Sequence, residues 1–223
     1  MVSGSIKRGA FIVLEGCDRC GKSTQSRSLV EFLQNNSVPV KYMAFPERTS
    51  NIGQVINAYL TNKQQLNDET IHLLFTANRW EHKNEIIEQL NSGTTLVVDR
   101  YSYSGIAYST AKGMSKEWCM GPETGLPRPD LVFYLKTSID ALLDRGNFGE
   151  ERYEREEFQQ KVGKVFDDIY NSEKSYWYEI DASQPKEVIH SIIKEKALQV
   201  LKEVETTATR ILKWTEKYHA DAC

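Results

Sequence analysis

The feature that most constrains the fold is an eight-residue segment, GCDRCGKS, at residues 16–23. It matches the pattern G-x-x-x-x-G-K-[ST], and it lies between a predicted buried strand at residues 10–15 and a helical pattern at residues 22–34. The glycines let the backbone wrap around an anion, and the helix N-terminus presents N–H groups to it. Lys22 would then bridge the β- and γ-phosphates of a nucleoside triphosphate, and the Ser23 hydroxyl would bind Mg²⁺. A chance match in a glycine-containing turn is disfavoured, because both flanking elements are predicted.

Short apolar runs alternate with helical patterns along much of the chain. Further strands are predicted at residues 38–44, 94–99, 130–136 and 176–181, and helices at residues 51–60, at residues 68–90 and from Pro185 onward. The helix over residues 68–90 is expected to stop at Gly93, since glycine readily adopts the left-handed conformation that closes a helix. The alternation predicts an α/β fold of the P-loop NTPase type, with a five-stranded parallel sheet and helices on both faces. We expect one domain over residues 1–223, with ligands at the carboxyl ends of the strands.

A charged segment, RGNFGEERYER at residues 145–155, interrupts this alternation. It follows a short helix predicted at residues 138–143, for which Ser138 would be the N-cap. The segment contains two glycines and three arginines, and it has no hydrophobic periodicity. Such a segment is typical of a mobile active-site lid, although a solvated linker is the alternative interpretation.

Composition limits the classes of partner. The formal net charge of −3 and the sequence pI of about 5.9 argue against binding of long nucleic acid, which usually needs a basic face. The first apolar run is too short to cross a bilayer or to form a signal-peptide core, so no membrane partner is expected. Four cysteines do not make a disulfide framework in a chain of this length, and we expect a cytoplasmic or nuclear location.

Two arginines follow predicted strand ends and indicate a second anion site. Arg48 ends the sequence FPER, and Arg100 follows Asp99. Arginine binds phosphate oxygens in a fork, and two such residues beside a P-loop favour an acceptor-phosphate site over two ordinary surface groups. The chain has no N-K-x-D run, which argues against a GTPase switch.

Phe75 and Arg79 lie four residues apart and therefore share one helix face. An aromatic ring beside a planar donor suits a nucleobase, which would stack on the ring and hydrogen-bond to the guanidinium. The alternative interpretation of Phe75 is an ordinary core residue.

Taken together, the motifs resemble those of the thymidylate kinases, in particular the eukaryotic and poxvirus branch that carries an arginine in the P-loop. The matching stretches are FIVLEGCDRCGKSTQS, FPERTSNIG, HLLFTANRWE, LVVDRYSYSGIAYS, GLPRPDLVFYL and RGNFGEERYE. They extend from Gly9 to about Asp181, whereas the stretch after Ala208 matches weakly and has no assigned role. The resemblance implies transfer of the γ-phosphoryl group of ATP to dTMP with Mg²⁺, giving dTDP and ADP in dTTP synthesis. It also implies a homodimer.

The resemblance implies a role for each matching position. The catalytic residues would be Arg19, Lys22 and Arg100. The ATP site would comprise Gly16, Asp18, Arg19, Cys20, Gly21, Lys22, Ser23, Thr24, Arg145 and Gln184. The dTMP site would comprise Asp18, Phe45, Arg48, Phe75, Arg79, Arg100, Ser104, Gly105 and Tyr108. The lid residues would be Arg145, Arg152, Tyr153 and Glu154, and the Mg²⁺ residues would be Ser23 and Asp99.

Several of these implied roles are more specific. Asp18 would accept a hydrogen bond from the sugar 3′-hydroxyl, and Tyr108, with Ser104 and Gly105, would disfavour ribose. Phe75 would stack on thymine while Arg79 bonds its edge. Gln184 would lie against adenine, and Asp99 would act on Mg²⁺ through water. Cys17 and Cys20 stand where the family usually has small or aliphatic residues. They are interpreted as buried packing residues, with a redox-sensitive pair as the alternative.

Two other functions fit parts of the sequence. A deoxynucleoside kinase would phosphorylate a neutral sugar hydroxyl, and it would need a carboxylate base but no acceptor-phosphate arginine such as Arg48. A nucleotide-binding regulator without turnover is disfavoured by the intact set of Arg19, Lys22, Ser23 and Arg100.

Overall fold

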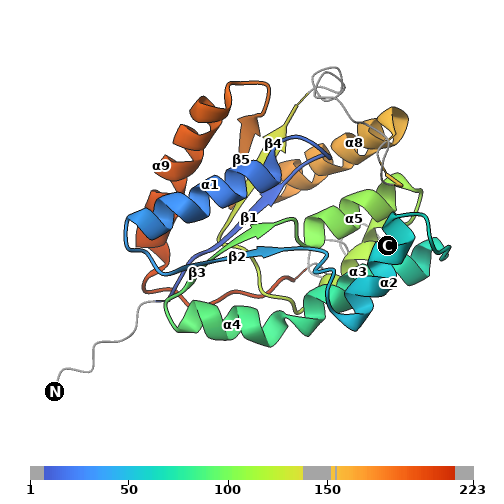
Figure 1. Cartoon of the computed structure of the whole chain (residues 1–223), viewed down its shortest axis with the longest axis horizontal. Helices are drawn as coiled ribbons and strands as arrows, with labels where there is room; N and C mark the ends of the chain where they lie inside the picture. The colour runs from blue at the N-terminus through green and yellow to red at the C-terminus, as the bar shows by residue number, and fades with distance from the viewer. Residues whose placement is uncertain (1–7, 138–151, 154, 214–223) are drawn as a thin grey trace, which may run out of the picture.

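The computed structural model describes residues 8–137, 152–153 and 155–213. Five strands in this part of the chain form one sheet of order β2-β3-β1-β4-β5, and every neighbouring pair is parallel (Figure 1). The strands are β1 (Phe11–Glu15), β2 (Val40–Ala44), β3 (Thr95–Asp99), β4 (Leu131–Lys136) and β5 (Trp177–Asp181). The predicted five-stranded parallel sheet is therefore confirmed.

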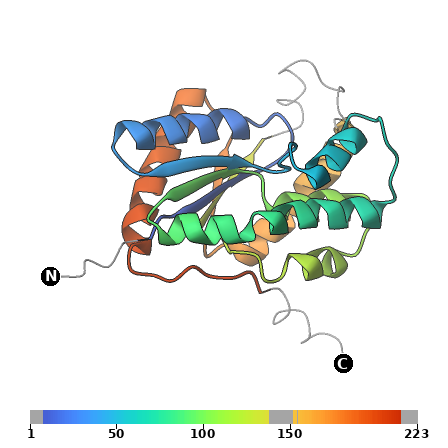
Figure 2. The same ribbon diagram turned by 60° about the horizontal axis from the view of Figure 1, so that its bottom comes forward.

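Helices cover both faces of this sheet. They are α1 (Lys22–Asn35), α2 (Asn51–Leu60), α3 (Asp68–Glu81), α4 (Lys83–Asn91), α5 (Ser102–Ala111), α6 (Lys116–Met120), the 3-10 helix η1 (Gly121–Glu123), α8 (Glu156–Glu173) and α9 (Lys186–Val204). Helices α1 and α9 lie on one face, and α4 and α8 lie on the other (Figures 1 and 2). Side-chain caps begin three of them: Ser50 Oγ accepts from the Gly53 amide at 3.0 Å, Asn67 Oδ1 accepts from the Thr70 amide at 3.0 Å, and Ser115 Oγ accepts from the Trp118 amide at 3.2 Å.

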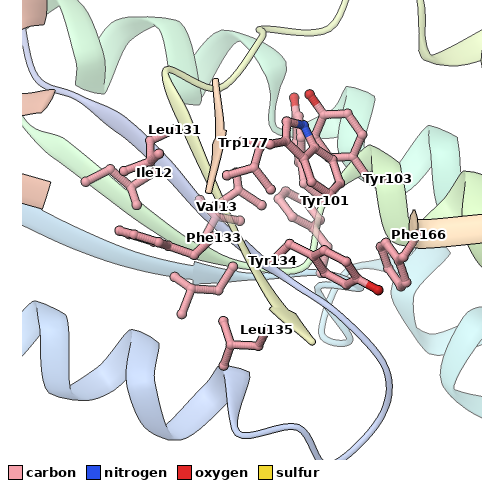
Figure 3. Packing of buried hydrophobic residues seen from close by; sticks show 14 of the residues in the cluster. Ile12, Val13, Tyr101, Tyr103, Leu131, Phe133, Tyr134, Leu135, Phe166 and Trp177 are labelled. Carbon is pink, nitrogen blue, oxygen red and sulfur yellow. The ribbon is translucent and has the colours of Figure 1, made fainter. Parts of the chain in front are cut away.

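The core alternates across the sheet as the pleat requires. On β4, Tyr134 points toward Phe166 of α8, and the two rings stack with centroids 5.6 Å apart (Figure 3). Phe133 and Leu135 point to the opposite side of the strand, where α1 lies (Figure 3). Every residue of β1 is buried, which is expected of a central parallel strand with helices on both faces.

The prediction of one continuous helix over residues 68–90 is wrong. The chain forms α3 and α4, and His82 between them has φ −97° and ψ 0°. The His82 ring packs edge-on against Phe45, with centroids 5.7 Å apart, and its Nδ1 lies 2.9 Å from the Glu85 carboxylate. These contacts stabilise the break, although the apolar periodicity continues through it. Gly93, at φ 90°, follows α4 as predicted.

Two predictions fall outside the described residues: the helix over residues 138–143 and most of the lid over residues 145–155, including Arg145 and Glu154. Arg152, Tyr153 and Arg155 of that segment are described. No helix in the described ranges is both long and apolar enough to span a membrane.

Candidate active site

The P-loop joins β1 to α1. Gly16, at φ 141°, has no room for a side chain, because a Cβ there would lie 2.5 Å from the Leu135 carbonyl oxygen. Gly21, at φ 99°, precedes α1, and the first-turn N–H groups of any helix lack intrahelical partners. Lys22 is buried, and its Nζ donates to the Cys17 carbonyl at 2.5 Å. The loop thus has the backbone geometry and the buried cation of an anion site.

An oxygen-donor pair lies beside the P-loop. The Ser23 hydroxyl donates to Asp99 Oδ2 at the end of β3. Asp99 is almost fully buried, and its Oδ1 has no hydrogen-bond partner among the described residues. A hydroxyl next to an unpaired carboxylate oxygen suits Mg²⁺, which takes oxygen ligands and binds through few protein groups when phosphates supply the others. The described ranges contain no group of three or more histidine, cysteine or acidic side chains that could hold a metal.

A pocket lies beside the P-loop, at the carboxyl end of the sheet. Its wall comes from the P-loop, the segment after β2, α2, α3, the start of α5 and Tyr153. The lining residues are Asp18, Phe45, Pro46, Arg48, Leu60, Phe75, Arg79, Arg100, Tyr101, Ser104, Gly105, Tyr108, Ser109 and Tyr153. All nine residues predicted for the dTMP site are among them.

The floor of this pocket carries a charged pair. The Arg100 guanidinium bonds to Asp18 Oδ1 and lies over the Tyr108 ring, 5.5 Å from its centroid. Burial alone would raise the pKa of Asp18, but the charges of Arg100 and Lys22 outweigh it and hold that pKa below its usual range. Burial likewise opposes the charge of Arg100, whose pKa is nevertheless raised by Tyr108 and Asp18. Both groups are therefore ionised at neutral pH.

Arg19 and Arg100 share an unusual backbone conformation. Their φ angles are 64° and 66°, in the left-handed region that residues other than glycine rarely adopt. Backbone strain of this kind persists only where surrounding contacts hold the residue in place, and it is found most often at functional sites. Both arginines were predicted to be catalytic.

Phe75 and Arg79 lie on the inner side of α3. Phe75 is half-buried and lines the pocket, which favours the base-stacking interpretation over a purely structural one. Arg79 is almost fully buried and pairs with Glu123 of η1, a residue that was not predicted. Gly105 packs directly against its guanidinium, so that an added Cβ would lie 2.5 Å from Nη2.

Gln159 of α8 is a second residue that sequence reasoning missed. It is fully buried, its Nε2 donates to Asp18 Oδ2 at 2.7 Å, and its Oε1 accepts from the Asp18 amide at 2.9 Å. The same Nε2 donates to the Tyr153 carbonyl at 3.0 Å. This side chain therefore joins the P-loop to the end of the predicted lid. Its sequence context, EEFQQKV, resembles an ordinary exposed helix and carries no signal for this role.

Glu15 ends β1, directly before the P-loop, and its side chain contacts the start of α5. Its carboxylate accepts from the Tyr101 amide at 2.8 Å, the Ser104 amide at 3.1 Å and the Ser104 hydroxyl at 2.5 Å. Complete burial raises the pKa of Glu15, against the opposing effects of Ser104 and Arg100. The carboxylate thus connects the strand before the P-loop with the first turn of α5.

The remaining predicted residues lie around these two regions. Thr24 and Ser23 are exposed on the first turn of α1, and Gln184 is half-buried between β5 and α9. The first residue of α9, directly after this connection, is bonded to α1, because Gln25 Nε2 donates to the Lys186 carbonyl at 3.0 Å. Arg152 donates to the Tyr59 carbonyl at 2.9 Å, on the acceptor side of the site.

The two P-loop cysteines are buried: Cys17 is 6% exposed and Cys20 is 1% exposed. Burial, reinforced by the neighbouring Cys20, raises the pKa of Cys17 to about 12. A protonated, enclosed thiol reacts slowly, so the packing interpretation is favoured.

Comparison with known proteins agrees with this geometry. Residues 14–193 match the family model described as thymidylate kinase. The chain is 49% identical over 208 residues to a thymidylate kinase of Arabidopsis thaliana, covering 93% of this chain and 78% of that protein. It is 46% identical over 189 residues to a Homo sapiens thymidylate kinase, covering 84% and 89%.

A solved structure of thymidylate kinase from Candida albicans matches with a TM-score of 0.82 and 35% identity, covering 92% of this chain and 99% of that one. A family match over most of the chain, together with relatives well above 40% identity, settles the class of protein. The chain belongs to the thymidylate kinase family and is an enzyme that phosphorylates dTMP to dTDP with ATP.

Proposed function

We propose that the phosphoryl group passes between two facing anion sites, the P-loop for ATP and the arginine-lined pocket for dTMP. Arg48 and Arg100 would bind the acceptor phosphate, Phe75 would stack on thymine, and Arg79 would bond its edge. The observation that supports this most is that one pocket beside the P-loop is lined by residues of all these types from separate segments of the chain.

The reaction does not need a general base from the protein. The second pKa of a phosphate monoester is about 6, so the attacking oxygen of dTMP is largely ionised at neutral pH. Catalysis would come from alignment of the two anions and from spreading the charge of the transferring group. Lys22, Arg19 and Arg100 would do this, and closure of the lid over residues 145–155 would exclude water.

Mg²⁺ would be held by the Ser23 hydroxyl and, through water, by Asp99. When bound, the ion neutralises charge on the β- and γ-phosphate oxygens. Oδ1 of Asp99 supports this assignment, because it has no hydrogen-bond partner in the part of the chain that the structure describes. Gln184 would lie against the adenine of ATP.

Asp18 would read the deoxyribose. Its carboxylate is ionised and already accepts from Arg100 and Gln159. An ionised carboxylate has about four acceptor positions, so Asp18 can accept a further hydrogen bond, and the 3′-hydroxyl would be that donor. Tyr108, Ser104 and Gly105 would enclose the 2′ side and exclude ribose.

We also propose one domain over residues 1–223, a homodimer in the cytoplasm or nucleus, and no nucleic-acid or membrane partner. The net charge of −3 supports the last point.

The decisive assay measures ADP release with dTMP, dUMP, thymidine and no acceptor. We expect turnover with dTMP and none with thymidine, because a phosphate clamp has nothing to bind on a neutral sugar hydroxyl. Comparable turnover with thymidine would refute the phosphate clamp.

Variants then test the individual arginines. Arg48→Ala should mainly raise the dTMP KM, and Arg100→Ala should also lower kcat, each by about 10- to 100-fold, the range expected for a lost hydrogen bond to a charged group. Arg210→Ala, which removes an exposed arginine from the opposite end of the sheet, is the matched control and should leave both constants unchanged.

A further inference from the structure

One buried carboxylate determines where the Arg79 guanidinium lies. Arg79 is 2% exposed and Glu123 is fully buried. Arg79 Nε donates to Glu123 Oε2 at 2.9 Å, and Nη2 donates to Oε1. The Thr76 hydroxyl donates to the same Oε1 at 2.7 Å. An arginine–carboxylate fork of this kind fixes orientation as well as distance.

The segment that carries Glu123 is itself held on two sides. Trp80 Nε1 donates to the Pro122 carbonyl at 2.8 Å. On the other side, the Gly125 amide donates to the Leu212 carbonyl at 3.1 Å, and the Leu212 amide donates to the Leu126 carbonyl at 2.9 Å. The carboxylate therefore lies on a connection that is hydrogen-bonded to both α3 and the segment after α9.

This arrangement leaves Nη1 as the nitrogen of Arg79 that can donate to a ligand. Nε and Nη2 donate to Glu123, and Nη2 also donates to the Thr76 hydroxyl at 3.4 Å, whereas no hydrogen bond from Nη1 is found among the described residues. The Arg79 side chain lines the pocket, with Gly105 packed against its guanidinium. A guanidinium donates hydrogen bonds, accepts none, and stays protonated in proteins. It can therefore pair with a carbonyl oxygen of a base and cannot pair with an amino group.

We propose that Glu123 is a positioning residue for base selection: it fixes Arg79 so that its free donors face the 4-carbonyl of thymine or uracil and reject the 4-amino group of cytosine. This inference rests on the proposed function, in which Arg79 bonds the base edge. With cytosine, the 4-amino group and the guanidinium would both be donors, and neither would have an acceptor. Buried donors without acceptors weaken binding of the wrong base more than the loss of a contact would.

The central test uses Glu123→Gln, which keeps the volume and one acceptor but places an amide N–H₂ against the guanidinium. We expect the dTMP KM to rise at least tenfold with little change in the ATP KM. The ratio of the dCMP inhibition constant to the dTMP KM should fall at least fivefold, because Arg79 is released from its single orientation. Glu123→Asp, which keeps the charge at a shorter reach, should give intermediate values.

The matched control is Asp130→Asn. Asp130 is also buried and forms a two-bond ion pair with Arg8, at 2.7 and 2.8 Å, at the opposite end of the sheet. Its variant should lose thermal stability while keeping the wild-type dTMP KM and base preference. If Asp130→Asn shifts both as far as Glu123→Gln does, the effect is structural and the inference is overturned.

Arg79→Ala distinguishes a failure of the base-edge role of Arg79 from a failure of the positioning role of Glu123. If this variant keeps the wild-type preference for dTMP over dCMP, the base-edge role of Arg79 fails and the inference falls with it. If Arg79→Ala loses that preference and Glu123→Asp keeps it, only the role of Glu123 is overturned. Since Glu123→Asp retains the buried charge, this comparison holds even where Glu123→Gln does not fold.

Discussion

Gly105→Ala is the smallest change that should disturb the acceptor pocket. The added Cβ would lie 2.5 Å from Arg79 Nη2, 3.2 Å from Cζ and 3.3 Å from Nη1. The first distance is a clash that real structures avoid, so the guanidinium must move. It is buried, and Nη2 itself bonds to Glu123, so any movement away from the new methyl group must also disturb that ion pair.

The magnitude follows from the cost of overpacking a well-packed site. Extra methylene groups in such sites cost about 1–3 kcal/mol. If this cost falls on the bound state, it corresponds to a loss of about 5- to 150-fold in kcat/KM for dTMP. The ATP KM should stay near its wild-type value, because the P-loop does not contact the Arg79 guanidinium through any described hydrogen bond or ion pair.

The assay varies dTMP at saturating ATP and then ATP at saturating dTMP, alongside thermal unfolding. The control is Gly121→Ala, where the Cβ would meet nothing within 4 Å and the backbone is helical, with φ −51° and ψ −58°. That variant should match the wild type in all three measurements. Wild-type kinetics and stability in Gly105→Ala would refute the view that Gly105 confines Arg79.

Three further predictions concern other parts of the site and core. 3′-Deoxy-dTMP should be a substrate about 10- to 100-fold poorer than dTMP, because Asp18 would lose its ligand donor; equal rates would remove Asp18 from the sugar site. Burial lowers the pKa of His72 below its usual value near 6.5, so the unfolded chain binds a proton that the folded chain does not, and stability should fall as the pH drops from 7.5 to 5.5. Urea unfolding should show a smaller drop in His72→Gln, and an identical drop would contradict this assignment. Cys17 should react slowly with iodoacetamide at pH 7.5, and the Cys17→Val, Cys20→Ala double variant should lose activity to peroxide as fast as the wild type; protection of the variant would instead indicate a redox role.

Local patterns predicted most of the fold. Each strand is a short run in which most residues are apolar, and the P-loop match depended on residues adjacent in the sequence, so neither needed knowledge of tertiary contacts. Helix α5 was not predicted, since its sequence, SYSGIAYSTA, contains three serines, two tyrosines and a glycine, and most of its residues are buried. Its helical state depends on burial against other elements, which no amphipathic pattern reports. The break at His82 likewise depends on a ring contact with Phe45, 37 positions earlier in the sequence.

In the site, too, local sequence predicted some residues and missed those that depend on tertiary contacts. Arginines that could bind phosphate were picked out near strand ends, and a base-binding pair was picked out on one helix face; all of them line one pocket. The partners of those residues could not be picked out. Glu123 lies 44 positions from Arg79, in a GPETG context that resembles an exposed turn, and Gln159 lies 141 positions from Asp18. A buried arginine on the inner side of a helix requires a carboxylate somewhere, but the sequence contains nothing that indicates which one.

Glu15 has a consequence for the spacing of the two substrates. The residue directly precedes the P-loop, and its carboxylate accepts from the first turn of α5, where the acceptor pocket begins. We therefore expect the distance between the P-loop and the acceptor pocket to depend on the length of the Glu15 side chain. An aspartate at this position would be one methylene shorter, and either these hydrogen bonds or the gap between donor and acceptor would have to change.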